Sequence, residues 1–209
     1  MDAIEPFIVR NYLLFFLLPI WVVTGALDWW THRRAGIERF GVREPALHLA
    51  LLSLAGLPIL LGLFLEINAV VVLAMTLCFL VHEAVGYIDI RWASGTRGIL
   101  PFEQRLHDYL AAIPFAALGL VIVLHWPDVM ALATAPIDAL REPLELRESP
   151  LPIEVIAFIL LLVLFGNVLP YLEEFARTLR YQRVHRNQRR DDLVGIEPVL
   201  NKGEPDADR

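Results

Sequence analysis

Five apolar runs dominate the chain, and each is long enough to cross a lipid bilayer. Spanning the hydrocarbon core takes about 20 helical residues at about 1.5 Å rise each. A backbone in lipid must satisfy its own hydrogen bonds, so such runs predict helices. We place the spans near residues 9–30, 46–65, 68–88, 106–126 and 152–173. The sequence therefore predicts an all-α, polytopic membrane protein, with a bundle of about five transmembrane helices over residues 1–175.

The rest of the composition agrees with this class of protein. Hydrophobic residues make up 56% of the 209 residues, above the roughly 45–50% of soluble domains. The net charge of −6 is spread over loops and tail, so it does not favour a nucleic-acid partner. Cys78 is the single cysteine, which excludes an intrachain disulfide and a cysteine-based zinc site. Residues 176–209 are expected to form a basic cytoplasmic helix followed by a disordered acidic tail.

The basic residues predict the orientation of the bundle. With five spans the loops alternate sides, and 15 of the 18 Lys and Arg residues fall on the side that holds the C-terminus. The opposite side holds only Arg10, Arg141 and Arg147. By the positive-inside rule, the N-terminus lies outside and the C-terminus in the cytoplasm. We expect an integral protein of a bacterial inner (cytoplasmic) membrane.

An acid and a histidine recur four residues apart at the ends of the spans on the expected cytoplasmic side. The pairs are Asp28 with His32, Glu44 with His48, and Glu103 with His107. Residues four apart share a helix face. Ionisable groups inside a membrane are costly unless they are paired, wetted or bound to metal. Three such pairs at one depth therefore predict a polar cluster inside the bundle, near the cytoplasmic face.

Imidazole and carboxylate groups are good ligands for iron, manganese and zinc. Helical bundles hold paired metals with acids and histidines from facing helices. We expect two metal ions, with iron in the leading interpretation and zinc or manganese as alternatives. The expected ligands are Asp28, His32, Glu44, His48, His82, Glu103 and His107. Glu44 precedes Pro45, so its role as ligand, cap or proton carrier stays open.

Further charged residues near this depth have predicted supporting roles. Glu83, which follows His82, is the expected catalytic carboxylate, as a bridge or a proton carrier. Residues expected to orient the histidines, or to replace a ligand, are Asp89, Asp108 and Glu173. Glu173 and Glu174 could both complete the site, although Arg177 can pair with either. Residues expected to bind a phosphate head group are Arg33, Arg34, Arg91 and Arg97.

A pair of metals in such a cluster suits oxygen activation, and the apolar bundle could accept an acyl chain. The leading interpretation is therefore an oxidoreductase that hydroxylates or desaturates a lipid or another hydrophobic substrate with O2 and an electron donor. The likeness to membrane desaturases is one of chemical type only. Their usual boxes, H-x-x-x-H and H-x-x-H-H, do not occur, nor does the E-x-x-H spacing of ferritin-like di-iron proteins.

Two other classes of function remain open. One is a zinc-dependent membrane lipid hydrolase, with Glu83 as general base. The other is a non-enzymatic ion or proton carrier, or a haem-binding electron carrier. A metal-free network of protons and salt bridges would also explain the same residues. Metal analysis with an optical spectrum separates these interpretations. The oligomeric state cannot be predicted.

Overall fold

The computed structural model describes the backbone of residues 4–200 and the side chains of residues 7–188. Over that part of the chain the fold is helical, with a single isolated bridge between Leu65 and Leu146. Five helical segments are long and apolar enough to cross a membrane: Phe7–Ala35, Arg43–Phe64, Ala69–Thr96, Pro101–Leu124 and Ile153–Gln188. The expectation of a helical protein with five candidate membrane spans is confirmed.

The spans are built from the following elements. The first consists of α1 (Ile4–Tyr12), the π-helical turn η1 (Leu13–Leu17) and α2 (Leu18–Ala35). The next three are α3 (Arg43–Phe64), α4 (Ala69–Thr96) and α5 (Pro101–Leu124). The last consists of α8 (Ile153–Val163), the π-helical turn η3 (Leu164–Val168) and α9 (Leu169–Leu200). Short helices η2 (Ile37–Arg39), α6 (Trp126–Thr134) and α7 (Pro136–Ala139) lie in the connections.

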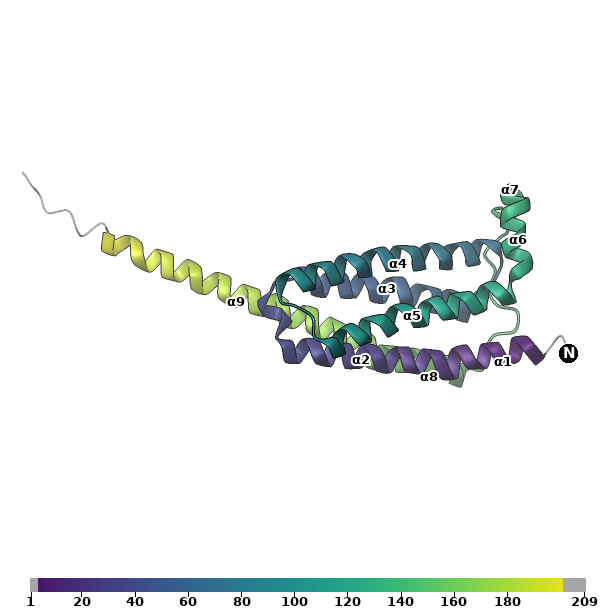
Figure 1. Cartoon of the computed structure of the whole chain (residues 1–209), viewed down its shortest axis with the longest axis horizontal. Coiled ribbons are helices and arrows are strands. Elements are labelled where there is room, and N and C mark those ends of the chain that lie inside the picture. The colour runs from purple at the N-terminus through teal and green to yellow at the C-terminus, as the bar shows by residue number, and fades with distance from the viewer. Residues whose placement is uncertain (1–3, 201–209) are drawn as a thin grey trace, which may run out of the picture.

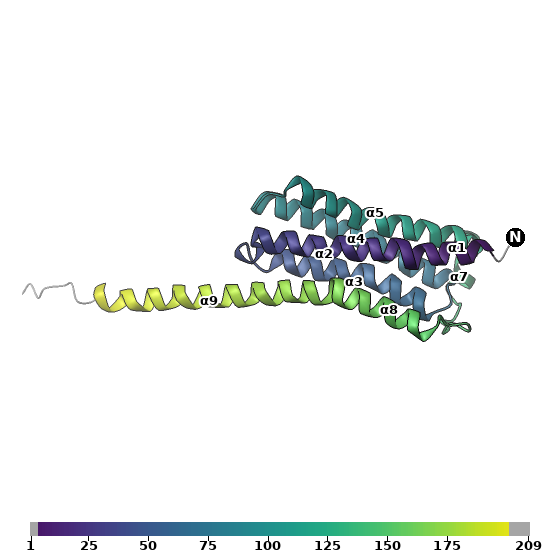
Figure 2. The same cartoon turned by 90° about the horizontal axis from the view of Figure 1, so that it is seen from below.

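The spans run lengthwise beside one another (Figure 1). Contacts join α3 to α4, α2 to α5, and α9 to both α2 and α3. At one end of the bundle α2 and α4 end while α3 and α5 begin. We call this the site end and the other the far end. Beyond the site end α9 continues as a lone helix (Figure 2), whereas α6 and α7 lie at the far end.

Glycines set the close approach of the first span to the fifth. A Cβ on Gly166 would lie 2.2 Å from Cγ1 of Val22, and a Cβ on Gly25 would lie 2.8 Å from Oδ1 of Asn167. Around this contact lies the buried apolar core of Leu18, Trp21, Val22, Leu63 and Ile159. Each glycine backbone therefore lies directly against a side chain of the other span, and this close packing brings the polar ends of α2 and α9 together.

The helices at the site end are longer than the apolar runs that predicted them. The first was expected to end near residue 30 but continues to Ala35, where Gly36 stops it in the left-handed conformation (φ +69°). The third was expected to end near residue 88 but continues to Thr96. Polar residues interrupt the apolar pattern there, with His32 and Asp89 buried inside the bundle and Arg33, Arg34 and Arg91 exposed. Hydropathy alone therefore ends these helices too early.

The C-terminal tail begins as a continuation of the fifth span. α9 extends from Leu169 to Leu200 without a break. Residues 191–200, the first half of the segment expected to be disordered, belong to this helix. Residues 201–209, the rest of the expected acidic tail, lie outside the described residues.

Candidate metal centre

Eight ionisable side chains are buried together at the site end, and every span contributes at least one. They are Asp28, His32, Glu44, His48, His82, Asp89, Glu103 and Glu174. His107 lies beside them and is nearly as enclosed. Buried charges persist in proteins when they are paired or hold a metal. The contacts of each side chain decide which of these two situations applies.

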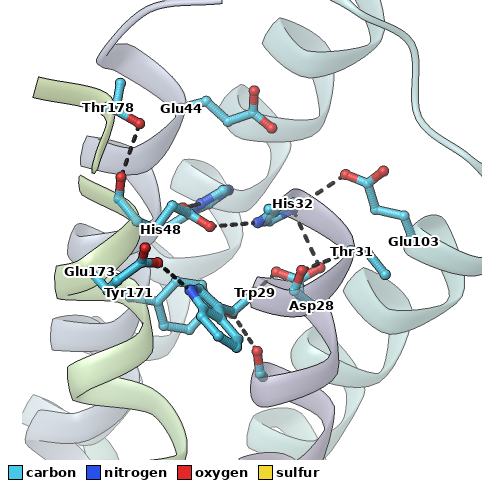
Figure 3. A network of polar contacts seen from close by, with 12 residues as sticks. Asp28, Trp29, Thr31, His32, Glu44, His48, Glu103, Tyr171, Glu173 and Thr178 are labelled. Carbon is cyan, nitrogen blue, oxygen red and sulfur yellow. Dashed lines mark hydrogen bonds and ion pairs between the residues drawn. The ribbon is translucent and has the colours of Figure 1, made fainter. Parts of the chain in front are cut away.

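His32 lies at the middle of the cluster and is fully buried. Its Nε2 atom is 3.2 Å from Oε1 of Glu103 and 3.5 Å from Oδ1 of Asp28. Its Nδ1 atom is 3.1 Å from Oε2 of Glu174. Asp28 lies one turn earlier on α2, as the four-residue spacing predicts. Figure 3 shows His32 between the carboxylates of Asp28 and Glu103.

His48 stacks on His32 and has a parallel set of contacts. The ring centroids are 4.5 Å apart, with 7° between the ring planes. Nδ1 of His48 lies 2.6 Å from Oε1 of Glu174, and its Nε2 lies 3.3 Å from Oδ2 of Asp89. Each ring therefore presents one nitrogen to Glu174 and the other to a different carboxylate.

Glu174 accepts a hydrogen bond from both of these rings. Its two carboxylate oxygens face the Nδ1 atoms of His32 and His48. We therefore assign the proton to Nδ1 in both rings, which leaves a lone pair on each Nε2. Metal-binding histidines commonly donate their other N–H to a carboxylate in this way. Thr178, one turn further on α9, donates to the backbone carbonyl of Glu174 at 2.9 Å.

Asp28 joins two further residues to the cluster. Its Oδ1 atom is 3.2 Å from Nε2 of His107, and its Oδ2 atom is 3.1 Å from the hydroxyl of Tyr171. The same hydroxyl lies 3.2 Å from the carbonyl oxygen of Gly25. Tyr171, near the start of α9, therefore links the fifth span to the carboxylate of Asp28 on the first.

Several atoms that face one another in the cluster make no hydrogen bond. Among the described residues, the buried atoms without one include Oδ1 of Asp28, Nε2 of His32, Nε2 of His48, Oδ1 of Asp89 and both ring nitrogens of His107. The Nε2 atoms of the three histidines lie 3.2–3.5 Å from carboxylate oxygens of Asp28, Asp89 and Glu103, but without hydrogen-bond geometry. Buried polar groups without partners are rare and require an explanation. A cation placed between these nitrogen and oxygen atoms would satisfy them.

Arg97 neutralises one edge of the cluster. It lies in the turn between α4 and α5, and its Nε atom donates to both carboxylate oxygens of Glu44 at 3.1 and 3.2 Å. Its terminal nitrogens bind Glu103, one of them at 3.1 Å. Burial lowers the pKa of Arg97, but the hydrogen bonds to Glu103 and Glu44 outweigh this and raise it above its ordinary value. The guanidinium therefore stays charged.

With its histidines neutral, the cluster would carry an excess of negative charge. Five carboxylates, each 3% exposed or less, face a single guanidinium: Asp28, Glu44, Asp89, Glu103 and Glu174 against Arg97. With neutral histidines, four negative charges remain. Two divalent cations would cancel them.

Three overlapping groups of side chains have ligand atoms within 4.8 Å of one another. One is Asp28 with His32 and His107, and another is His32 with Glu44 and Glu103. The third is His32 with His48 and Glu174. We do not interpret it as a metal site, because its close contacts are the Nδ1 hydrogen bonds to Glu174. The seven expected ligands are thus largely brought together, with His82 as the exception.

His82 and Glu83 lie beside the cluster. Nδ1 of His82 is 3.3 Å from Oε1 of Glu83, and the Glu83 side chain is 43% exposed. Both residues line a cavity of 280 Å³ together with Asp28, His48 and Asp89. They therefore face the cluster across this cavity and belong to none of the three groups.

Other residues that the sequence analysis singled out lie at the periphery. Glu173 pairs with Arg33 at 2.8 Å and accepts from Nε1 of Trp29 at 3.0 Å. Asp108 is exposed and bonds to Gln104 and Arg105. Arg34 lies over the ring of Trp30, and Arg91 is exposed.

Sequence reasoning missed Tyr171 and preferred Glu173 to its neighbour Glu174. A signal for Glu174 was nevertheless present. Glu173 lies four residues before Arg177, which is the favourable order for a helical ion pair, and the structure has this pair at 3.2 Å. Adjacent residues point about 100° apart on a helix. Pairing of Glu173 with Arg177 on the surface therefore turns Glu174 inward.

No protein-family model, curated protein or solved structure matches the chain. The site must therefore be interpreted from its own geometry.

Proposed function

We propose that the chain binds two divalent metal ions, iron in first place, and is a membrane oxidoreductase that hydroxylates or desaturates a lipid or another hydrophobic chain. One observation carries the proposal. Nitrogen and oxygen atoms of the type that bind iron, without hydrogen bonds of their own, meet beside a cavity inside the bundle that is lined by both polar and apolar side chains.

We assign the donors to two proposed positions. Asp28, His32, His107 and Glu103 would provide ligands for the first. His48 and Asp89 would provide ligands for the second, and both line the small cavity together with Asp28. Glu174 fixes the orientation of His32 and His48. Arg97 holds the carboxylate of Glu103 in place and closes the cluster at the turn between α4 and α5.

Bound iron would transfer electrons to O2. The protein would position the hydrophobic substrate and deliver the protons that the reaction consumes. Hydroxylation consumes O2, two electrons and two protons, replaces a C–H hydrogen by a hydroxyl group and releases one water. Desaturation consumes the same reagents, removes two hydrogens from adjacent carbons and releases two waters. The electrons require an external donor. Glu83, partly exposed and in contact with His82, is placed to pass protons toward the cavity.

The cytoplasmic face is the proposed location of the cluster, because 15 of the 18 basic residues fall on the side of the site end. A soluble electron donor would then reach the site end directly.

The test begins with metal analysis and an optical spectrum of purified protein. We expect about two irons per chain and no Soret band. His107→Ala should lower the iron content, whereas His125→Ala, at the far end, should leave it unchanged. Reduced, iron-loaded protein given O2 and membrane lipids should form a hydroxylated or unsaturated chain. A single bound zinc, together with cleavage of an ester in the absence of O2, would establish the hydrolase instead. Purified protein that contains no metal would contradict the proposed metal centre.

A further inference from the structure

A second and larger cavity lies between the cluster and the far end. Its volume is 610 Å³, and its lining is mainly apolar. Trp21 and His82 line both this cavity and the smaller one beside the cluster. At the other extreme it reaches Arg10 of α1 and Arg147 of the loop before α8. The two cavities therefore adjoin at Trp21 and His82, and together they outline a path from the cluster to two arginines at the far end.

The two arginines have unused hydrogen-bonding capacity. The Nε atoms of Arg10 and Arg147 are buried and have no hydrogen-bond partner. Among the side chains of residues 7–188, neither guanidinium makes an ion pair. The backbone of Arg147 is fixed by its N–H, which donates to the carbonyl of Phe64 at 3.0 Å. Both side chains are half-buried, and an anion is the partner that would satisfy their buried Nε–H groups.

The length of the path fits a hydrocarbon chain. Arg10 and Trp21 are eleven residues apart on the first span, or about 16 Å at the helical rise. This is close to half of the ~30 Å hydrocarbon core, the thickness of one leaflet. The volume also lies within the range of about 300–1,000 Å³ typical of small-ligand sites.

We propose that this cavity binds one amphiphile, with an anionic head group held by Arg10 and Arg147 and a hydrocarbon chain that extends to His82. The head group is a carboxylate or a phosphate. Binding does not depend on metal, but the identification of this amphiphile as the substrate rests on the proposed function. The carbon presented to the metals would then lie far from the head group, at the distal part of the chain.

Binding of three probes of equal chain length tests the head group. Palmitate, palmitoyl lysophosphatidate and hexadecanol are titrated into the purified full-length protein, and displacement of a fluorescent fatty acid is measured. An anionic probe should bind about ten-fold or more tightly than the alcohol, as expected for charge-assisted hydrogen bonds. Preference for palmitate identifies a free fatty acid, and preference for the phosphate identifies a phospholipid-type head.

Variants at the far end locate the head group. Arg10→Gln and Arg147→Gln should each weaken binding of the anionic probe about ten-fold and leave the alcohol unchanged. Arg141→Gln is the matched control, because Arg141 is exposed at the same end and pairs with Asp138. Equal affinity for hexadecanol, or full affinity in both variants, would overturn the proposal. Weaker binding in Arg91→Gln alone would place the head group at the site end.

A second pair of variants tests the path of the chain. Ala117 lines the cavity and Ala116 is exposed on the outside of α5. Ala117→Phe should shift the preference to shorter fatty acids, and Ala116→Phe should not. Unchanged chain-length preference in Ala117→Phe would contradict the path. Iron content measured in the same samples separates failure of this inference from failure of the metal centre, because the two measurements are independent.

Discussion

Glu174 is the residue on which the orientation of both stacked histidines depends. Glu174→Gln keeps the size of the side chain but can accept only one of the two Nδ1 hydrogens. We expect metal affinity to fall about 10–100-fold, as for other carboxylates that orient metal-binding histidines. Titration of the metal-free protein with Fe²⁺ under anaerobic conditions measures the change.

Glu173→Gln is the control for this substitution. It changes the neighbouring residue in the same way, but Glu173 bonds to Trp29, Arg33 and Arg177 at the surface. Metal affinity should stay within about two-fold of the unchanged protein, since exposed ion pairs contribute about 0–1 kcal/mol. A larger effect of Glu173→Gln than of Glu174→Gln would contradict the assigned roles.

Arg97 is the cation that the buried carboxylates share. Arg97→Met removes the guanidinium, which leaves Glu44 without its ion pair and Glu103 with His32 as its only close neighbour of opposite character. Loss of one member of a buried ion pair costs about 3–5 kcal/mol of unfolding free energy. Chemical unfolding in mild detergent would measure this loss. Arg91→Met, at an exposed position of α4, should change the unfolding free energy little, and equal stability of the two variants would refute the argument.

The spacing of residues predicted part of the cluster and could not predict the rest. Asp28 and His32 lie on one face because α2 is regular, so their contact follows from the sequence. The contact of Nδ1 of His32 with Glu174 joins residues 142 positions apart. Such a contact depends on which spans are neighbours, which a hydropathy pattern does not contain. For the same reason Arg97 was expected to bind a head group, and the structure places it between Glu44 and Glu103.

At the scale of elements, the contact between α2 and η3 sets the geometry of the site. Gly166→Ala would place a methyl group 2.2 Å from Cγ1 of the buried Val22. The two spans must then move apart, at a cost of about 1–3 kcal/mol for overpacking. Since α2 carries Asp28 and α9 carries Glu174, metal affinity should fall as well. Thermal unfolding and metal titration would measure the two effects.

Gly119→Ala provides the comparison for that prediction. A Cβ at Gly119 meets no atom within 4 Å, so only the helix propensity of α5 changes. Stability and metal affinity should both stay near those of the unchanged protein. If the two glycine variants behaved alike, close packing at Gly166 would not be the cause.

The number of spans was predictable from the sequence, since each apolar run corresponds to one span. The residues at which the helices end were harder to predict. Hydropathy marks only the apolar part of a helix, whereas α2 and α4 continue through buried polar residues and exposed arginines at the site end. Neither π-helical turn could be expected from hydropathy, because η1 (LLFFL) and η3 (LFGNV) lie inside apolar runs that continue as helix on both sides.

At the scale of the whole molecule, orientation in the membrane is the main prediction. The basic residues predict that the site end lies in the cytoplasm and the far end outside. Reporter fusions after Leu65 and after Arg190 should therefore report opposite sides, with the second in the cytoplasm. Activity of both fusions on the same side would be incompatible with five spans.

The cluster cannot be completed until the last span has been synthesised, because it joins residues of the first span to a residue of the last. Asp28 and His32 belong to the first span, and Glu174 to the last. At roughly 5–20 residues per second, translation of the intervening 142 residues takes about 7–28 s. Until then the earlier spans carry acids and imidazoles into the bilayer without their final partners. An unfinished or truncated chain therefore differs from a finished one in the cluster itself, because the Nδ1 atoms of His32 and His48 then lack their carboxylate acceptor at membrane depth.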